Sequence, residues 1–180
     1  TDIGTGLALR ELGLRLESHD NTRIKKNAVY LAQTAGVGLG YYFCWSPNGG
    51  AVEAHGELRN CLARLTNASE ENWKYNSLDE ESRKKLSRLK KKIIDPYIAR
   101  PQLLSTKLEL LTSVHFIHER NRIKEPARIQ RIFEEYGWLV GIEHVKEAIE
   151  RCLEVRKELK MPIGNDAYRG KNVYRVLLKT

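Results

Sequence analysis

The sequence has few of the residues on which disulfide-stabilised, zinc-binding or membrane-spanning proteins depend. It contains three cysteines in 180 residues, Cys44, Cys61 and Cys152, an odd number set far apart. We expect all three to be reduced and buried, as in a cytoplasmic protein. No apolar run reaches the roughly 20 residues of a membrane span. The first residues, Thr1–Gly4, lack the basic start and apolar stretch of a signal peptide, so we expect a cytoplasmic protein that does not contact membranes.

Residue patterns for catalysis and metal binding are also missing. His115 and His118 lie three residues apart, but neither has a cysteine nearby and no H-E-x-x-H motif occurs. We expect His115 at the edge of the core and His118 at the surface. Gly36-Val37-Gly38-Leu39-Gly40 leads into aromatic residues, whereas a phosphate-binding loop needs Gly-Lys-Ser/Thr. The sequence therefore predicts no catalytic residue, no metal, no cofactor and no enzymatic activity.

Charge is the clearest compositional signal. The chain has 31 lysines and arginines against 23 acidic residues, a net charge of +8, with 41% hydrophobic residues. This balance is typical of a globular domain with a core of its own. The positive excess favours an acidic partner, either DNA or RNA or an acidic face of another protein, although solubility alone is the simpler explanation.

Apolar residues recur at helical spacing along most of the chain. The spacing predicts helices over about 7–16, 22–35, 58–65, 80–95, 108–117, 127–136 and 142–160. Ser77 with Glu80, and Thr106 with Glu109, match the capping box that opens a helix. Pro126 suits a first helical turn, and a glycine after a helix readily adopts the left-handed backbone that ends it.

Strand signals are few and short. Leu39–Trp45 is the best candidate in the first half, followed by a turn at Ser46–Gly50. Val173–Leu178 predicts a second strand near the end of the chain. The predicted fold is therefore mostly α: one helical domain over residues 1–162 with a few short strands. We expect residues 163–180 to form a C-terminal tail that contains a short strand and could supply a small strand pair.

Two groups of cations are the candidate surface for nucleic acid or an acidic partner. The first surrounds an inward stripe of Leu86, Leu89 and Ile93, and consists of Arg83, Lys84, Lys85, Arg88, Lys90, Lys91 and Lys92. The second flanks the turn before Pro126 and consists of Arg120, Arg122, Lys124, Arg128 and Arg131. Such groups can neutralise phosphates without reading sequence, but a solvated helix face is the usual explanation of a charge run.

Aromatic residues suggest a second kind of contact. Tyr41, Tyr42 and Trp45 exceed what a small core needs, and tyrosine and tryptophan are favoured anchors at protein interfaces. We therefore expect some of these three to be exposed as a protein interface.

A helix-turn-helix regulator that binds DNA is the alternative function. A short helix over 127–136, a turn at Gly137 and a longer helix over 142–160 have the required order, and Tyr168–Asn172 could form a wing. The apolar link Gly137–Gly141 instead suggests a helix hairpin packed in the core. The second helix is also rich in acids, which a helix in a DNA groove should not be: Glu143, Glu147, Glu150, Glu154 and Glu158.

Three segments resemble a known family. Residues 24–33 read I-K-K-N-A-V-Y-L-A-Q, residues 39–45 read L-G-Y-Y-F-C-W, and residues 107–116 read K-L-E-L-L-T-S-V-H-F. They resemble the K-L-Q-K-L-V-Y-L-L-Q, L-G-Y-x-F-x-W and L-E-L-L-A-S-I-H-Y segments of the uncharacterised prokaryotic YwgA-like proteins. Gly49–Val52 departs from the G-P-Y-S that follows in that family, which puts its turn and any contact made there in doubt.

More distantly, the pattern is similar to the SocA/Panacea antitoxin group of helical adaptors. That resemblance implies a non-enzymatic accessory or adaptor subunit of a prokaryotic defence or toxin–antitoxin system. The larger partner would be a toxin, or an SMC-like ATPase of a defence complex such as Lamassu. Apolar motifs of this kind carry information about fold rather than function.

Overall fold

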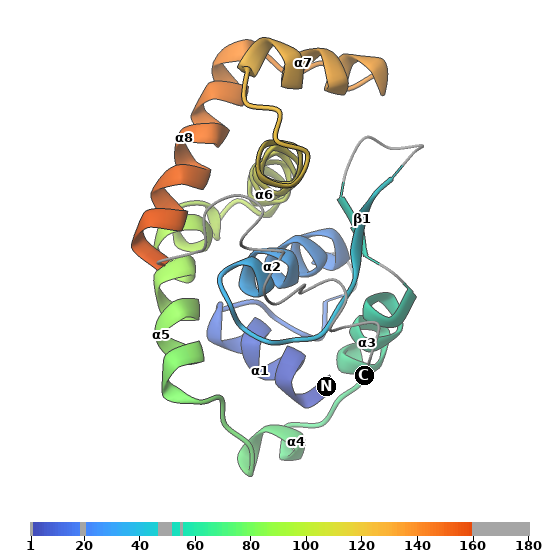
Figure 1. The fold of residues 1–180 in the computed structure, drawn as a ribbon. Helices are drawn as coiled ribbons and strands as arrows, with labels where there is room; N and C mark the ends of the chain where they lie inside the picture. The colour runs from blue at the N-terminus through green and yellow to red at the C-terminus, as the bar shows by residue number, and fades with distance from the viewer. Residues whose placement is uncertain (1, 19–20, 47–51, 55, 160–180) are drawn as a thin grey trace.

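The fold is mostly helical, as the sequence predicts (Figure 1). The structure is a computed structural model that describes residues 2–18, 21–46, 52–54 and 56–159. Its helices are α1 (Asp2–Glu11), α2 (Thr22–Thr34), α3 (Gly56–Thr66), α4 (Glu71–Lys74), α5 (Glu80–Leu89), α6 (Pro101–His115), α7 (Pro126–Glu135) and α8 (Ile142–Leu159). α5 continues into a π-helical turn, Lys90–Ile94, and a 3₁₀ turn, Asp95–Tyr97, and α6 into a second π-helical turn, Phe116–Arg120.

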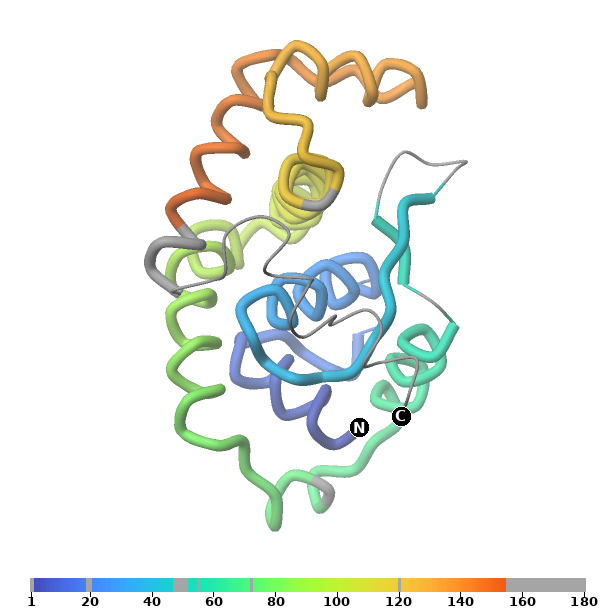
Figure 2. The backbone as a smooth tube through the Cα atoms, viewed as in Figure 1, coloured from blue at the N-terminus to red at the C-terminus, as the bar shows by residue number. Residues whose placement is uncertain are grey.

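Helix α2 lies at the centre of the molecule. Figure 2 shows α1, α3, α5 and α6 around it, with α8 against α5 and α6, and α7 across the far end of α8. The apolar residues Ile24, Ala28 and Leu31 of α2 are buried, as their spacing predicts. The polar residues Lys25 and Asn27 are buried as well, so α2 is enclosed on nearly all sides.

Polar pairs set the position of α2 against α6. Three of them join the two helices in the same chain order: Arg23–Glu109, Asn27–Thr112 and Tyr30–His115. The contacts measure 3.3 Å, 3.2 Å and 2.8 Å respectively. Because the positions rise together along both helices, α2 and α6 run parallel. A shift by one turn would break all three pairs, two of which are buried.

Other polar side chains of α2 hold the neighbouring loops. Lys25 Nζ donates to the carbonyl oxygens of Leu16 and Ser18, at 2.8 Å and 2.7 Å, and its burial lowers the pKa of the ammonium. Gln33 accepts a hydrogen bond from the backbone N–H of Tyr41 and donates one to its carbonyl oxygen. These bonds satisfy groups whose burial would otherwise cost free energy.

The first helix begins and ends earlier than predicted. α1 ends at Glu11, and Gly13 takes a left-handed backbone with φ of 77°. Leu12, Leu14 and Leu16 are buried although they follow the helix. Their spacing therefore reflected burial of an irregular segment against the core.

Both predicted capping boxes are wrong. The N-cap of α5 is Asp79, whose carboxylate accepts from the backbone N–H of Ser82 at 2.8 Å. α6 begins earlier, at Pro101, and Thr106 lies inside it, where its hydroxyl donates to the carbonyl oxygen of Gln102. In each case another residue favoured at a first turn starts the helix, aspartate as a cap and proline inside the turn.

The strand prediction holds only in part. β1 (Phe43–Trp45) pairs antiparallel with β2 (Val52–Ala54), with Phe43 opposite Ala54 and Trp45 opposite Val52. The earlier part of the predicted strand is not in the sheet, because Gln33 takes both backbone groups of Tyr41. Most of the predicted turn at Ser46–Gly50 lies outside the described residues, as does the predicted tail with Val173–Leu178.

We expect Tyr30→Phe to lower the free energy of unfolding by about 1–3 kcal/mol, because it removes the hydroxyl that meets His115 while keeping the ring against Phe43. Urea denaturation measures the change. Tyr75→Phe is the matched control: Tyr75 is 87% exposed, so the same chemical change should cost less than about 0.5 kcal/mol. Equal costs at the two positions would contradict the role assigned to the buried pair.

Candidate interaction surface

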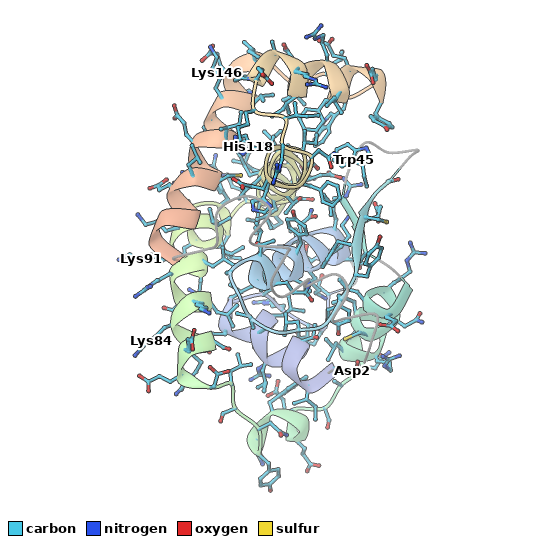
Figure 3. The ribbon with its side chains drawn as sticks, in the orientation of Figure 1. Asp2, Trp45, Lys84, Lys91, His118 and Lys146 are labelled. Atoms are coloured by element: carbon cyan, nitrogen blue, oxygen red, sulfur yellow. The ribbon has the colours of Figure 1, made fainter. Side chains whose placement is uncertain are left out.

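The outer face of α5 and its π-helical turn carries a stripe of cations. Leu86, Leu89 and Ile93 are buried as predicted, which leaves the opposite face in solvent. Lys84, Arg88 and Lys91 lie three or four positions apart on that face, and Arg83 lies beside them, all four exposed. We call these four residues the ridge. Figure 3 shows Lys84 and Lys91 on the same side of the molecule, away from the core.

The three other lysines of this segment are less exposed than the residues of the ridge. Lys85 pairs with Glu81 at 2.8 Å, Lys90 with Asp95 at 2.9 Å and Lys92 with Glu154 at 3.7 Å. Their side chains are 23%, 37% and 38% exposed respectively. The surface of seven cations stays a prediction, in which these three lysines are only partly exposed and already paired.

Two of these lysines cover the ends of other helices. Gly36 follows α2 and Gly13 follows α1, both with positive φ. A Cβ added to Gly36 would lie 2.9 Å from Lys85 Nζ, and one added to Gly13 would lie 2.9 Å from Lys90 Cε. A cation near a helix C-terminus is favourable, so Lys85 and Lys90 stabilise the fold.

The second group of cations lies elsewhere. Lys124, Arg128 and Arg131 are exposed at and before α7, and Arg122 is exposed with a φ of 56°. The side chain of Arg120 is outside the described part. α7 and α5 occupy separate parts of the molecule (Figure 1), so the two groups do not form one continuous surface.

Of the three aromatic residues expected at a protein interface, one is buried and two are half-buried. Tyr41 is 5% exposed and its hydroxyl lies 2.6 Å from the Thr5 hydroxyl; burial raises the pKa of Tyr41. Tyr42 and Trp45 are half-buried. The Trp45 ring lies 5.9 Å from those of Phe116 and Tyr136, between the hairpin and α7 (Figure 3). Trp45 thus packs the hairpin against the helical part of the molecule, and an interface at these aromatic residues stays a prediction.

His118, expected at the surface, is buried. It is 6% exposed, and its Nδ1 lies 3.2 Å from Glu119 Oε1 in the π-helical turn after α6. His115 is 8% exposed and meets Tyr30, close to the expected position at the edge of the core. Over the residues that the structure describes, no group of three or more histidines, cysteines, aspartates or glutamates is placed to hold a metal.

α7 and α8 have the helix order that the alternative function requires. α7 and α8 pack together across residues 136–141, and Val145, Ala148 and Cys152 are the buried face of α8. The solvent face of α8 carries exposed Glu143, Glu147 and Glu150, which DNA phosphates would repel. The link between the helices was expected in the core, yet Leu139 is 87% exposed. The segment proposed as a wing lies outside the described residues.

Two cations that sequence reasoning did not single out lie near Lys92. Lys107 of α6 pairs with Glu147 at 3.8 Å, and Arg151 of α8 pairs with Glu154 at 3.1 Å, the same carboxylate side chain that Lys92 reaches. The three cations come from three elements far apart in sequence. No local pattern could have grouped them.

Comparison with protein-family models, with curated proteins and with solved structures finds no match. No helix in the described ranges is long and apolar enough to cross a membrane. The resemblance to YwgA-like proteins stays a prediction.

We expect the cysteines to differ in reactivity. Cys44 is half-buried in β1, whereas Cys61 and Cys152 are buried, and burial raises the pKa of the Cys61 thiol. Since the thiolate is the nucleophile, iodoacetamide at mildly alkaline pH should modify Cys44 first and the other two only after denaturation. Mass spectrometry of the peptides reports the order. Modification of Cys61 in the folded protein as fast as Cys44 would reopen the question of a reactive cysteine.

Proposed function

We propose that this protein is a non-enzymatic adaptor subunit that binds an acidic face of a larger protein through the ridge. The observation that carries the proposal is the arrangement of Arg83, Lys84, Arg88 and Lys91 on the solvent face of a helix whose other face is in the core. A helix anchored in this way holds its cations in a fixed pattern. Complementary charge of this kind governs association rate and choice of partner.

The pattern of neighbouring charges favours a protein partner over nucleic acid. Glu80 and Glu81 are exposed beside the ridge, and Glu80 pairs with Lys84 at 2.7 Å. A phosphate backbone is uniformly negative and would meet these carboxylates as well as the cations. A protein surface of mixed charge can match each of them.

The resemblance to YwgA-like and SocA/Panacea proteins supports the class of partner. On that basis the larger protein is a toxin or an SMC-like ATPase of a defence locus, and the adaptor holds it or presents it to another protein. The helical fold is compatible with this role. A DNA-binding regulator remains the alternative and is separated from the adaptor by the experiment below.

The test compares two sets of charge reversals of identical composition. Arg83→Glu, Arg88→Glu and Lys91→Glu alter the ridge, while Lys124→Glu, Arg128→Glu and Arg131→Glu make the same change around α7. All six positions are exposed, so neither set should change the free energy of unfolding by more than about 0.5 kcal/mol per site. Partner captured from the native host at low salt is measured by quantitative mass spectrometry.

We expect the ridge set to lose the partner at least about tenfold, since like charges brought together at an interface cost several kcal/mol. The α7 set should keep it. Equal retention by both sets would overturn the proposal. Capture of no protein, together with a ridge-dependent mobility shift of duplex DNA, would replace it with the nucleic-acid alternative.

A further inference from the structure

A small apolar hollow opens between the end of α5, α6 and α8. Ile93 of the π-helical turn, Leu111 of α6 and Ala148 of α8 lie in its wall, with Tyr97 and Leu110 beside them. Its volume is about 40 Å³. A cavity of about 150 Å³ is needed to take up a benzene ring, so this hollow has room for the tip of an aliphatic side chain and not for an aromatic ring.

Cations surround the hollow. Lys92, Lys107 and Arg151 line it, and their side chains are 38%, 32% and 34% exposed. Long basic side chains of this exposure bury their methylene stems and keep their charges in water. The Lys107 ammonium also lies 5.8 Å from the centre of the Tyr97 ring. The result is an apolar floor whose rim carries three cations beside the carboxylate of Glu147.

The carboxylate of Glu147 holds Lys107 loosely, because the two lie 3.8 Å apart, near the outer limit of an ion pair. Lys92 and Arg151 both reach Glu154, at 3.7 Å and 3.1 Å. Partly exposed pairs of this kind contribute little. A carboxylate brought by a ligand can therefore take up Lys107 at small cost.

We propose that this hollow is a docking site for a short acidic segment of the partner protein, in which one aliphatic side chain has carboxylates on both sides. The aliphatic tip enters beside Ala148, and the carboxylates meet Lys92, Lys107 and Arg151. This inference rests on the proposed adaptor function and specifies how the same partner is held. Charge and size together select the occupant.

The hollow and the ridge are joined by consecutive residues of one helical segment. Lys91 belongs to the ridge and Lys92, the next residue, lines the hollow. One acidic surface on the partner can thus lie along α5 and place its anchor between α6 and α8. The ridge alone offers only exposed charges, which are weakened by salt, whereas a buried aliphatic group adds binding that salt does not screen.

The experiment uses two peptide probes, E-D-E-L-E-D-E and E-D-E-S-E-D-E, which differ only in the central side chain. Titration into the isotope-labelled full chain is followed by amide chemical shifts. We expect the leucine peptide to bind on the order of tenfold more tightly than the serine peptide, because it alone buries an apolar group. Its largest shifts should fall at residues 92–97, 107–111 and 144–151. Equal affinity, or shifts confined to 83–91, would overturn the docking site.

Substitutions then locate the two parts of the interaction. Ala148→Phe projects a ring into the hollow and should abolish the preference for leucine, while Lys107→Gln with Arg151→Gln should weaken both peptides alike. If Ala148→Phe lowers stability, Leu110→Gln at the half-buried wall tests the same point. A preference for leucine that survives both Ala148→Phe and Leu110→Gln would overturn the site.

The result is separable from that of the adaptor proposal. A ridge-dependent partner whose binding is unchanged in a folded Ala148→Phe variant would leave the adaptor standing and remove the docking site. A preference for the leucine peptide that depends on Ala148, without any ridge-dependent protein partner, would support the site and remove the adaptor proposal in its present form.

Discussion

The enclosure of α2 is the constraint on which the rest of the structure depends. A helix buried on nearly all sides requires a partner for each of its polar side chains, because an unpaired polar group in the interior is costly. Lys25 meets this need with the loop after α1, Gln33 with the segment before β1, and Asn27 and Tyr30 with α6. The satisfaction is incomplete: among the described residues Asn27 Nδ2 has no partner. The hydrogen bonds that are made fix the position of α2 against its neighbours, and the unpaired amide group of Asn27 lowers the stability of that arrangement.

The same constraint divides the cations of α5 into two kinds. Because α1 and α2 end against α5 at Gly13 and Gly36, Lys90 and Lys85 lie over those helix ends. Their positive charges therefore stabilise the C-terminal ends of α1 and α2. Other cations of this segment, including Lys91, are exposed to solvent. A basic segment that looks uniform in sequence thus contains two kinds of cation, some that support the fold and others that face solvent.

Sequence reasoning succeeded where burial follows a single period. α2, α3, α7 and α8 begin and end within a few residues of expectation, because their apolar stripes are long and their ends carry proline or glycine. It failed where contacts with residues far away in the sequence determine whether a side chain is buried. Tyr41 is buried because Gln33 and Thr5 meet it, and Leu139 is exposed although its neighbours are apolar. His118 is buried because a π-helical turn follows α6, which alters the angular position of every later residue.

The candidate site illustrates the limit in another way. The ridge could be inferred from one segment, because its residues repeat on one helix face. The hollow beside it could not, because Lys92, Lys107 and Arg151 meet only after α5, α6 and α8 have packed. In the sequence, the glutamates of α8 indicate only that this helix does not bind DNA. In the structure, two of them, Glu147 and Glu154, pair with the cations around the hollow. Recognition of an acidic segment would then be an exchange of carboxylates, in which the partner replaces weak pairs that the chain already makes. Selectivity in such an exchange comes from the apolar anchor, since any acidic segment can supply the charge.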